Sequence, residues 1–422
     1  MVDSLSPQTW PFSLGWLPQP AYLVGGGVRD ALRGYNAALT DLDFVLPANA
    51  VETARAIANH YRAGFVLLDA ERQIARVVFE QATADFALQV GPTLTTDLER
   101  RDFTVNAIAY EPHTQELFDP LHGCADLKQG VLRMVSPANL AEDPLRLLRA
   151  YRQAAQLGFE LEPATQRQIR QLAPRLKQVA AERVRVELGY LLSTHGGTPM
   201  LQAAICDGLL QDWLPRVTAT NLAQLAAVET AAIVLAEHWP PLQVDLNRIW
   251  GDRLRGGEAT RRTLLAMAKL ACLLGHDSQA AAQTLQNLKY SRQEILLVVN
   301  LLKLLSQIDT ETKLTHLARR ELFFLFQTAG QAFPALAVLS LAQGVGLAAI
   351  APLITAWFNP DDAIAHPQTL ITGKDLLKYL HLNPGPKIGQ LLKQLESAQA
   401  EGKITTPTEA LALAKLLLEP LF

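Results

Sequence analysis

The pattern of apolar residues changes near residue 137, and this change limits the fold more than any other feature of the chain. Before it, short runs rich in β-branched and aromatic residues alternate with Gly and Pro turns, as in small sheets. After it, apolar residues recur at spacings of three and four, which is the period of amphipathic helices. We therefore predict an α+β chain with a small mixed sheet in residues 1–137, helices at 28–32 and 50–60, and only helices afterwards. The predicted strands are AYLVGG, DLDFVL, FVLLD, ARVVFE, ADFAL, FTVNAIAY and VLRMV.

Breaks in the helical part suggest further divisions. Gly196 and Gly197, the Trp and Pro residues at 212–215 and 239–241, and the loop at 360–367 interrupt the helical pattern. We predict boundaries that give segments 1–137, 138–205, 206–360 and 361–422.

Composition excludes several classes of protein. A chain of 422 residues can bury a large core, and its net charge of −3 does not by itself indicate nucleic-acid binding. Cys124, Cys206 and Cys272 lie far apart, so we expect neither a zinc ribbon nor a disulfide framework. The first 20 residues are broken by Pro and Gly before any apolar run reaches signal-peptide length. We therefore expect a cytoplasmic protein.

One stretch has the composition of a membrane span. No charged residue occurs between Leu322 and Pro360, and residues 334–358 are mostly apolar. Gln343, Gly344 and Pro352 interrupt this stretch, so we expect two buried helices and no membrane partner. A membrane-anchored protein is the alternative interpretation.

A glycine turn begins the first chemical motif. The segment Gly25-Gly26-Gly27-Val28-Arg29-Asp30 follows a predicted strand and begins a helix. Backbone amides at such a turn can approach a phosphate closely, and Arg29 could pair with it. A glycine turn before a helix is also common for purely structural reasons, and the segment matches neither a P-loop nor a dinucleotide fingerprint.

Paired carboxylates form the second motif. Asp41 and Asp43 alternate along the strand DLDFVL, so their side chains share one face. Two such carboxylates suit Mg²⁺ ions in phosphoryl or nucleotidyl transfer, and Asp85 on a neighbouring strand is a candidate third ligand. A solvated turn, with Asp85 an ordinary edge-strand charge, is the alternative.

Arginines and further carboxylates form the last two motifs. In the first, Arg100 and Arg101 precede Asp102 and Asn106; these side chains could hold a triphosphate and a ribose, or could form a solvated charged face. In EDPLRLLRA, Asp143 and Arg146 could read the edge of a base, or could be a helix cap with an i,i+3 ion pair.

Taken together, GGGVRD, DLD, RRDFTVNA and EDPLRLLRA resemble, in order and spacing, the motifs of class II tRNA nucleotidyltransferases. This family comprises the CCA-adding enzymes and their bacterial poly(A) polymerase relatives. AERVRVEL at 181–188 is similar to its last neck motif, and ITGKDL and PGPKIG at 371–389 resemble its tail. The resemblance covers about residues 20–190 and 368–415.

The resemblance implies a polymerase-beta-like nucleotidyltransferase head, a helical neck that recognises the base, a helical body, and a helical tail that binds tRNA. Asp41 and Asp43 would be catalytic and hold Mg²⁺. Asp143 and Arg146 would select cytosine or adenine without a nucleic-acid template. The residues expected to bind the nucleotide are Gly26, Arg29, Arg100, Arg101, Asp102, Asn106, Asp143, Arg146, Arg149 and Arg183. The substrates would be the 3′ acceptor end of tRNA and CTP, with ATP as a further substrate of a full CCA enzyme.

The segment between Asp85 and Asp102 departs from many CCA-adding members, because it lacks their Arg- and Gly-rich insertion. In this family a shortened loop accompanies enzymes that add only cytidines, so we predict CC addition. Full CCA addition, A addition and poly(A) synthesis remain alternatives, as does an RNA-binding protein without activity.

Basic residues indicate where RNA would lie. Residues 146–187 carry nine basic side chains against four acidic ones. Lys387 lies in the turn 384–389 before a helix predicted at 390–399, where it could contact a tRNA phosphate. The alternatives are that the basic residues lie on ordinary exposed helices, and that the turn only connects two helices through Pro and Gly. His276-Asp277 has no further ligands at helical spacing, so we expect surface residues or a helix cap there and not a metal centre.

Overall fold

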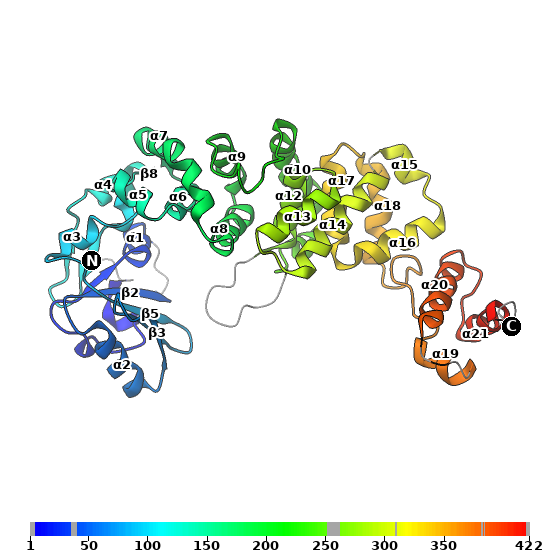
Figure 1. The fold of residues 1–422 in the computed structure, drawn as a ribbon, viewed down its shortest axis with the longest axis horizontal. Coiled ribbons are helices and arrows are strands. Elements are labelled where there is room, and N and C mark those ends of the chain that lie inside the picture. Colours follow the sequence, from blue (N-terminus) through cyan, green and yellow to red (C-terminus); the bar gives the residue numbers. More distant parts are fainter. Residues whose placement is uncertain are drawn as a thin grey trace. The chain divides into compact units, whose positions relative to one another are not determined.

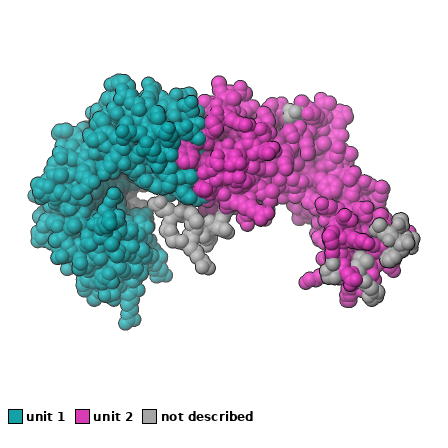
Figure 2. Space-filling view, in the orientation of Figure 1, with its two compact units in different colours: residues 1–212 teal, residues 213–422 magenta. Residues whose placement is uncertain are grey.

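The computed structural model describes residues 5–34, 40–250, 262–308, 310–380, 383 and 385–418. These divide into two compact units, Met1–Asp212 and Trp213–Phe422, which are coloured separately in Figure 2. The predicted boundaries at 137, 205 and 360 are finer than this division and stay predictions.

The first unit is built on a seven-stranded mixed sheet with the order β3-β4-β5-β2-β1-β6-β7. The strands β2 and β5 are parallel, and the other neighbours are antiparallel. The bounds are β1 Tyr22–Val24, β2 Asp41–Leu46, β3 Gly64–Asp69, β4 Ile74–Val78, β5 Thr83–Leu88, β6 Ala109–Glu111 and β7 Glu116–Phe118. A small parallel sheet pairs β8, Val131–Leu132, with β9, Glu160–Leu161.

The two faces of the large sheet differ because side chains alternate along each strand. Leu42 and Phe44 of β2 are buried in the core of the head with Phe86 of β5, whose ring stacks on Phe44 at 5.3 Å. Helix α2, Ala50–Tyr61, and the N-terminal segment with Trp10 cover this face. Asp41 and Asp43 therefore lie on the opposite face, and this face forms the site.

Short helices surround the carboxylate face, and a run of helices follows (Figure 1). The helices around the head are α1 Gly26–Leu32, α3 Leu94–Leu98, η4 Thr104–Asn106, α4 Gly123–Gln129 and α5 Pro137–Glu142. The rest of the unit comprises α6 Leu145–Leu157, α7 Pro163–Leu172, η5 Ala173–Gln178, α8 Ala181–Ser193 and α9 Gly197–Cys206. The predicted change to helix after residue 137 is confirmed, apart from the two-residue β9.

The predicted strand FTVNAIAY is wrong in its first half, which forms η4 before β6 begins. Asp102 Oδ1 accepts from the Phe103 N–H at 2.9 Å and from Asn106 Nδ2 at 2.9 Å. Such local side-chain hydrogen bonds compete with strand pairing, and here they turn the backbone.

The second unit is helical in the residues that the structure describes. Its helices are α10 Ala219–His238, α11 Pro240–Leu246, α12 Leu264–Leu274, α13 Ser278–Asn287, α14 Arg292–Gln307, α15 Glu311–Thr315, α16 Arg319–Ala329, α17 Phe333–Ala342, α18 Leu347–Phe358, α19 Gly373–Leu380, α20 Pro386–Ala400 and α21 Pro407–Leu418. Helix α20 begins at Pro386, so the predicted start at residue 390 is wrong, because Pro is well suited to the first turn of a helix.

Residues 334–358 form two separate helices, as predicted, but only the first of them is largely buried. Residues 333–340 of α17 are buried, whereas α18 buries only Ala349, Ile350 and Ile354. By length and composition, the helical segments Ala219–His238 and Arg319–Ala342 could each cross a membrane, and 33% and 67% of their apolar 18-residue windows are buried inside the protein. Buried core helices commonly meet the same criteria.

Candidate active site

The carboxylates of β2 face a neighbouring strand. Asp43 is paired in register with Asp85 of β5, and Asp41 with Thr83, whose Oγ1 donates to Asp41 Oδ1 at 2.7 Å. Asp43 is open to solvent on one side, but the surrounding protein raises its pKa to about 6. Desolvation contributes most, followed by the charge of Asp85, while Arg101 acts in the opposite direction. A bound cation would relieve this destabilisation of the charged carboxylate.

Asp85 is engaged by an arginine. Arg76 Nε and Nη2 donate to its two carboxylate oxygens at 2.7 and 2.8 Å. Among the residues that the structure describes, no group of three His, Cys, Asp or Glu side chains is arranged to hold a metal ion. Asp41 and Asp43 nevertheless fit Mg²⁺, which proteins commonly hold by one or two carboxylates together with water and substrate phosphates. The prediction that Asp85 is a third ligand stays a prediction, and it requires Arg76 to release the carboxylate.

The glycine turn brings the backbone close to these groups. Gly25 has φ +75°, and a Cβ placed there would lie 3.3 Å from Asp43 Oδ2 and 3.6 Å from Arg101 Nη1. A Cβ at Gly26 would lie 3.4 Å from Arg29 Nη2. Glycine at these positions therefore allows β1 and α1 to approach both a carboxylate and two guanidinium groups.

Arg29 is held by two partners. Its Nε and Nη2 donate to Asp30 at 2.8 and 2.9 Å, and its Nη1 donates to Asn106 Oδ1 at 2.7 Å. These bonds use three of the five N–H donors of a guanidinium, so two stay available, and Arg29 lines the same cleft as Asp43.

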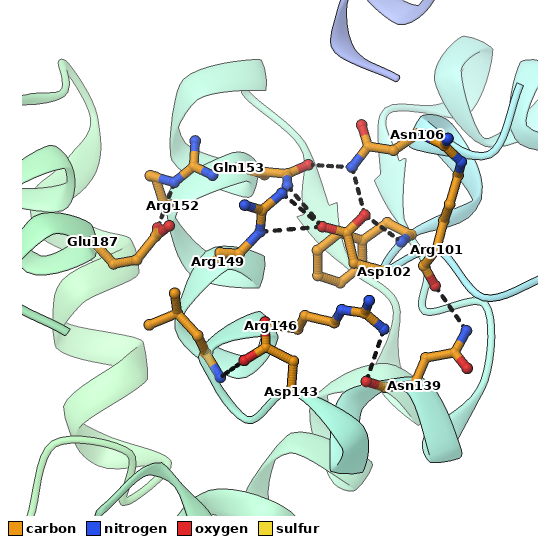
Figure 3. A network of polar contacts seen from close by, with 12 residues as sticks. Arg101, Asp102, Asn106, Asn139, Asp143, Arg146, Arg149, Arg152, Gln153 and Glu187 are labelled. Atoms are coloured by element: carbon orange, nitrogen blue, oxygen red, sulfur yellow. Dashed lines mark hydrogen bonds and ion pairs between the residues drawn. The ribbon is translucent and has the colours of Figure 1, made fainter. Parts of the chain in front are cut away.

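Asp102 is the centre of a buried polar network (Figure 3). In addition to the bonds from Phe103 and Asn106, its Oδ2 accepts from Arg149 Nε and Nη2 at 3.2 and 3.0 Å. Burial would raise the pKa of Asp102, but Arg149 and the hydrogen bonds outweigh burial and hold this pKa below its usual value. The carboxylate is therefore ionised at neutral pH, and it orients Arg149.

The adjacent arginines have different environments. Arg101 Nη2 lies 3.4 Å from Asp97 Oδ2, while its buried Nε has no hydrogen-bond partner among the described residues. Arg100 is half-exposed and lies 3.4 Å from Glu142. Arg101 thus keeps one buried donor that no described protein group satisfies.

The ion pair between Asp143 and Arg146, which was the alternative interpretation of this motif, does not form. Asp143 Oδ2 accepts from Arg183 Nη2 at 2.8 Å, and its Oδ1 accepts from the Leu145 N–H at the start of α6. Arg146 Nη1 donates to the backbone carbonyls of Arg100 and Asn139 at 3.1 and 3.0 Å. Asp143 ends α5, and this turn separates the two side chains that a single continuous helix would have paired.

Two clefts gather most of the predicted residues. The first cleft has a volume of about 570 Å³, and its predicted lining residues are Gly26, Arg29, Asp43, Arg101, Asp102, Asn106 and Arg149. The second cleft, of about 620 Å³, is lined by Arg100, Arg101 and Arg146 together with apolar residues such as Val45 and Val90. Asp41, Asp85, Asp143 and Arg183 line neither cleft, and Lys387 is an exposed residue of the second unit.

Sequence reasoning did not identify Arg152, Gln153 and Gln156 as lining residues of the first cleft. They continue the face of α6 that begins at Arg149, and the spacing of four and three between Arg149, Gln153 and Gln156 is the signal that could have revealed them. Arg152 Nε donates to Glu187 Oε2 of α8 at 2.5 Å, and burial raises the pKa of Glu187 despite this partner.

Two predictions for the second unit can be compared with the structure. Asp277 caps α13 by accepting from the Gln279 and Ala280 N–H groups, so the predicted cap is confirmed. Pro384, the first residue of the predicted RNA-binding turn, lies outside the described residues.

Known protein families match three segments of the chain. Residues 21–133 match the profile of the poly(A) polymerase head domain, and residues 260–414 match tRNA nucleotidyltransferase domain 2. Residues 158–220 match the RNA and SrmB-binding site of polymerase A. The CC-adding tRNA nucleotidyltransferase of Synechocystis sp. is 46% identical over 412 residues, which cover 97% of this chain and 96% of the relative. The chain belongs to the tRNA nucleotidyltransferase family.

Two further relatives extend the comparison. The CC-adding tRNA nucleotidyltransferase of Geobacter sulfurreducens is 33% identical over 404 residues, which cover 92% of this chain and 90% of that relative. Apo form I of a CCA-adding enzyme superposes with a TM-score of 0.69 at 22% identity, covering 95% of this chain and 90% of the other. The last likeness shows the fold of this nucleotidyltransferase, with its mixed-sheet head followed by helices.

Proposed function

We propose that this nucleotidyltransferase adds two cytidines from CTP to the 3′ end of tRNA without a nucleic-acid template. In each step a bond forms between the terminal O3′ of the RNA and the α-phosphorus of CTP, and the bond to the departing pyrophosphate breaks. The observation that carries the proposal is that Asp43 lines the same cleft as Arg29, Arg101 and Arg149. A carboxylate suited to a cation lies there beside guanidinium groups suited to a triphosphate.

Asp41 and Asp43 would hold Mg²⁺, and Asp85 would join them if Arg76 releases its carboxylate. When bound, the metal supplies activation of the attacking hydroxyl and neutralisation of charge on the departing pyrophosphate.

The first cleft would take the nucleotide. The two remaining donors of Arg29 and the guanidinium of Arg101, which also lines this cleft, can bind phosphate oxygens, and the backbone at Gly26 allows a close approach. Asp102 and Asn106 would order the ribose pocket, Arg149 would support the base or triphosphate, and Arg100 would add positive charge.

Base selection would fall to Asp143 and Arg146. The Asp143 carboxylate accepts bonds from Leu145 and Arg183 out of about four possible, and Arg146 donates through its Nη1. Both side chains therefore keep hydrogen-bonding capacity for the edge of a cytosine, with Arg183 orienting Asp143.

The choice of CC over CCA addition rests on two supports. The relatives at 46% and 33% identity are both CC-adding enzymes. The segment between Asp85 and Asp102 forms a turn at Gly91 and the short helix α3, and Asp97 Oδ1 accepts from the Val90 N–H at 3.0 Å. This leaves no long insertion that could adapt the pocket to ATP. Addition of CCA, of A alone or of poly(A) are the alternatives.

For the RNA, exposed arginines and lysines of α7, η5 and α8 would contact phosphates of the acceptor arm, as would Lys387 near the start of α20. The site of action would be the cytoplasm, where tRNA precursors and nucleoside triphosphates occur and where three free cysteines stay reduced.

The experiment is extension of a labelled tRNA that lacks its CCA end, with purified protein and Mg²⁺, resolved at single-nucleotide length. CTP alone, ATP alone and both are compared. Two additions with CTP and no further step with ATP are expected. A third, ATP-dependent step would replace CC addition by CCA addition, and ATP-dependent elongation of unrelated RNA would indicate a poly(A) polymerase.

A further inference from the structure

Gln153 is a buried polar residue that lines the first cleft. It belongs to α6, and only 3% of its surface is exposed. Its Oε1 accepts from Asn106 Nδ2 at 2.8 Å, and its Nε2 lies 3.4 Å from Asp102 Oδ2 (Figure 3). Gln153 therefore contacts both Asn106 and Asp102, the two residues that we expect to order the ribose pocket.

The orientation of the Asn106 amide depends on these contacts. Its Nδ2 has two hydrogens, which go to Asp102 Oδ1 and Gln153 Oε1. A flipped amide would direct its oxygen at the Asp102 carboxylate and at the Gln153 oxygen, so two acceptors oppose the flip. In the observed orientation Asn106 Oδ1 is left to accept from Arg29 Nη1.

The network continues to the guanidinium groups that face the cleft. Arg29 is reached through Asn106, and Arg149 is reached through Asp102, which accepts from both Gln153 and Arg149. We propose that Gln153 is a positioning residue for the incoming nucleotide, because it sets the Asn106 amide and thereby the Arg29 guanidinium.

A purely structural contact between α6 and η4 is the competing explanation, and a pH profile separates the two. In Gln153→Glu, the protonated carboxyl has the same pattern as the amide: its carbonyl accepts from Asn106 and its O–H donates to Asp102. The ionised carboxyl instead repels Asp102. Burial and Asp102 raise the pKa of the introduced carboxyl, whereas Arg149, which donates to the same Asp102 oxygen, lowers it in part. The ionised form is the defective one because it loses the bond to Asp102.

The expected result is that the CTP-dependent rate of Gln153→Glu, relative to the unmodified protein, rises at least fivefold as pH falls from 8.5 to 6. If the ratio does not change with pH, the hydrogen-bonding role is refuted.

Gln166 provides a matched control. Its Nε2 donates to Asp207 Oδ2 at 2.7 Å, and Asp207 is paired with Arg170, but these residues line neither cleft. Gln166→Glu therefore creates the same kind of carboxylate pair away from the two clefts, and it is assayed at saturating tRNA because Arg170 belongs to the α7 arginines proposed to contact RNA. Its activity relative to the unmodified protein should not depend on pH, and a matching pH profile in both variants would overturn the proposal.

Gln153→Met removes both hydrogen bonds at similar side-chain length. We expect the KM for CTP to rise about tenfold, the loss expected for one net hydrogen bond, with the KM for tRNA unchanged. If Gln153 acts through Asn106, the double variant with Asn106→Ala should bind CTP no worse than Asn106→Ala alone. Additive losses, or a change confined to the KM for tRNA, would contradict the proposal.

This inference rests on the proposed function, and the two can fail separately. If the unmodified protein does not extend tRNA with CTP, the proposed function itself is refuted. Normal extension with unaffected Gln153 variants refutes only the positioning role.

Discussion

The variant Asp102→Asn tests the buried network directly. The oxygen of the introduced amide can keep the bonds from Phe103 and Asn106, whereas its NH₂ group would face Arg149 and Gln153, which are donors themselves. The change therefore removes the two bonds from Arg149 and the weak one from Gln153, and it leaves a cation without its partner.

The magnitude follows from these losses. Hydrogen bonds to charged groups contribute about 1.5–3 kcal/mol each, but the Arg149 side chain is 37% exposed and can be partly hydrated again. We expect the free energy of local unfolding around Asp102 to fall by about 2–3 kcal/mol. This is roughly a 30- to 150-fold increase in the equilibrium constant for local opening.

Amide hydrogen exchange measures this loss without requiring the two units to unfold together. Peptides covering η4 and the first turns of α6 should exchange faster by that factor, while peptides of α10 and α17 should not change. The pH dependence has a defined sign: because the folded pKa of Asp102 is lowered, its contribution is present above the unfolded pKa of about 3.9 and is lost as pH falls. Unchanged exchange in η4 and α6 would refute the role of Asp102 as the centre of the network.

Two further predictions concern the carboxylates. Gly25→Ala places a Cβ 3.3 Å from Asp43 Oδ2 at φ +75°, so kcat/KM for CTP should fall about 10- to 100-fold. The control Gly208→Ala has similar backbone strain at φ +84°, but nothing lies within 4 Å of its Cβ, so it should keep its activity. Equal activities of the two variants would contradict the close approach of Gly25 to Asp43. Because the pKa of Asp43 is raised to about 6, its charged form is disfavoured in the folded protein, and Mg²⁺ should raise the Tm more at pH 7.5 than at pH 5. Equal shifts at the two pH values, measured by differential scanning fluorimetry, would count against a metal at Asp43.

Local patterns predicted the elements of the head well where burial alone decides them. The alternation in DLDFVL places Asp41 and Asp43 on one face because Leu42 and Phe44 are buried on the other. The change of period after residue 137 likewise predicted the helices. These features depend on the nearest residues in the chain.

Contacts between distant residues were not predictable from the same patterns. Helical spacing suggested that Asp143 pairs with Arg146, but a turn places Asp143 beside Arg183, which is 40 residues away. Asp85 appeared as a free carboxylate because its partner Arg76 comes from the register between β4 and β5. Gln153 was overlooked because its only signal in the sequence is its spacing from Arg149, while its partners Asn106 and Asp102 are 47 and 51 residues away.

The single-nucleotide extension of a CCA-lacking tRNA by Asp43→Asn, beside the unmodified protein, tests the central claim most directly. The account predicts that this variant loses at least about 1,000-fold in the rate of CMP transfer, because the remaining amide binds Mg²⁺ poorly, while tRNA affinity stays within a few-fold. Extension by Asp43→Asn at a rate within a few-fold of the unmodified protein would contradict nucleotidyl transfer at this cleft.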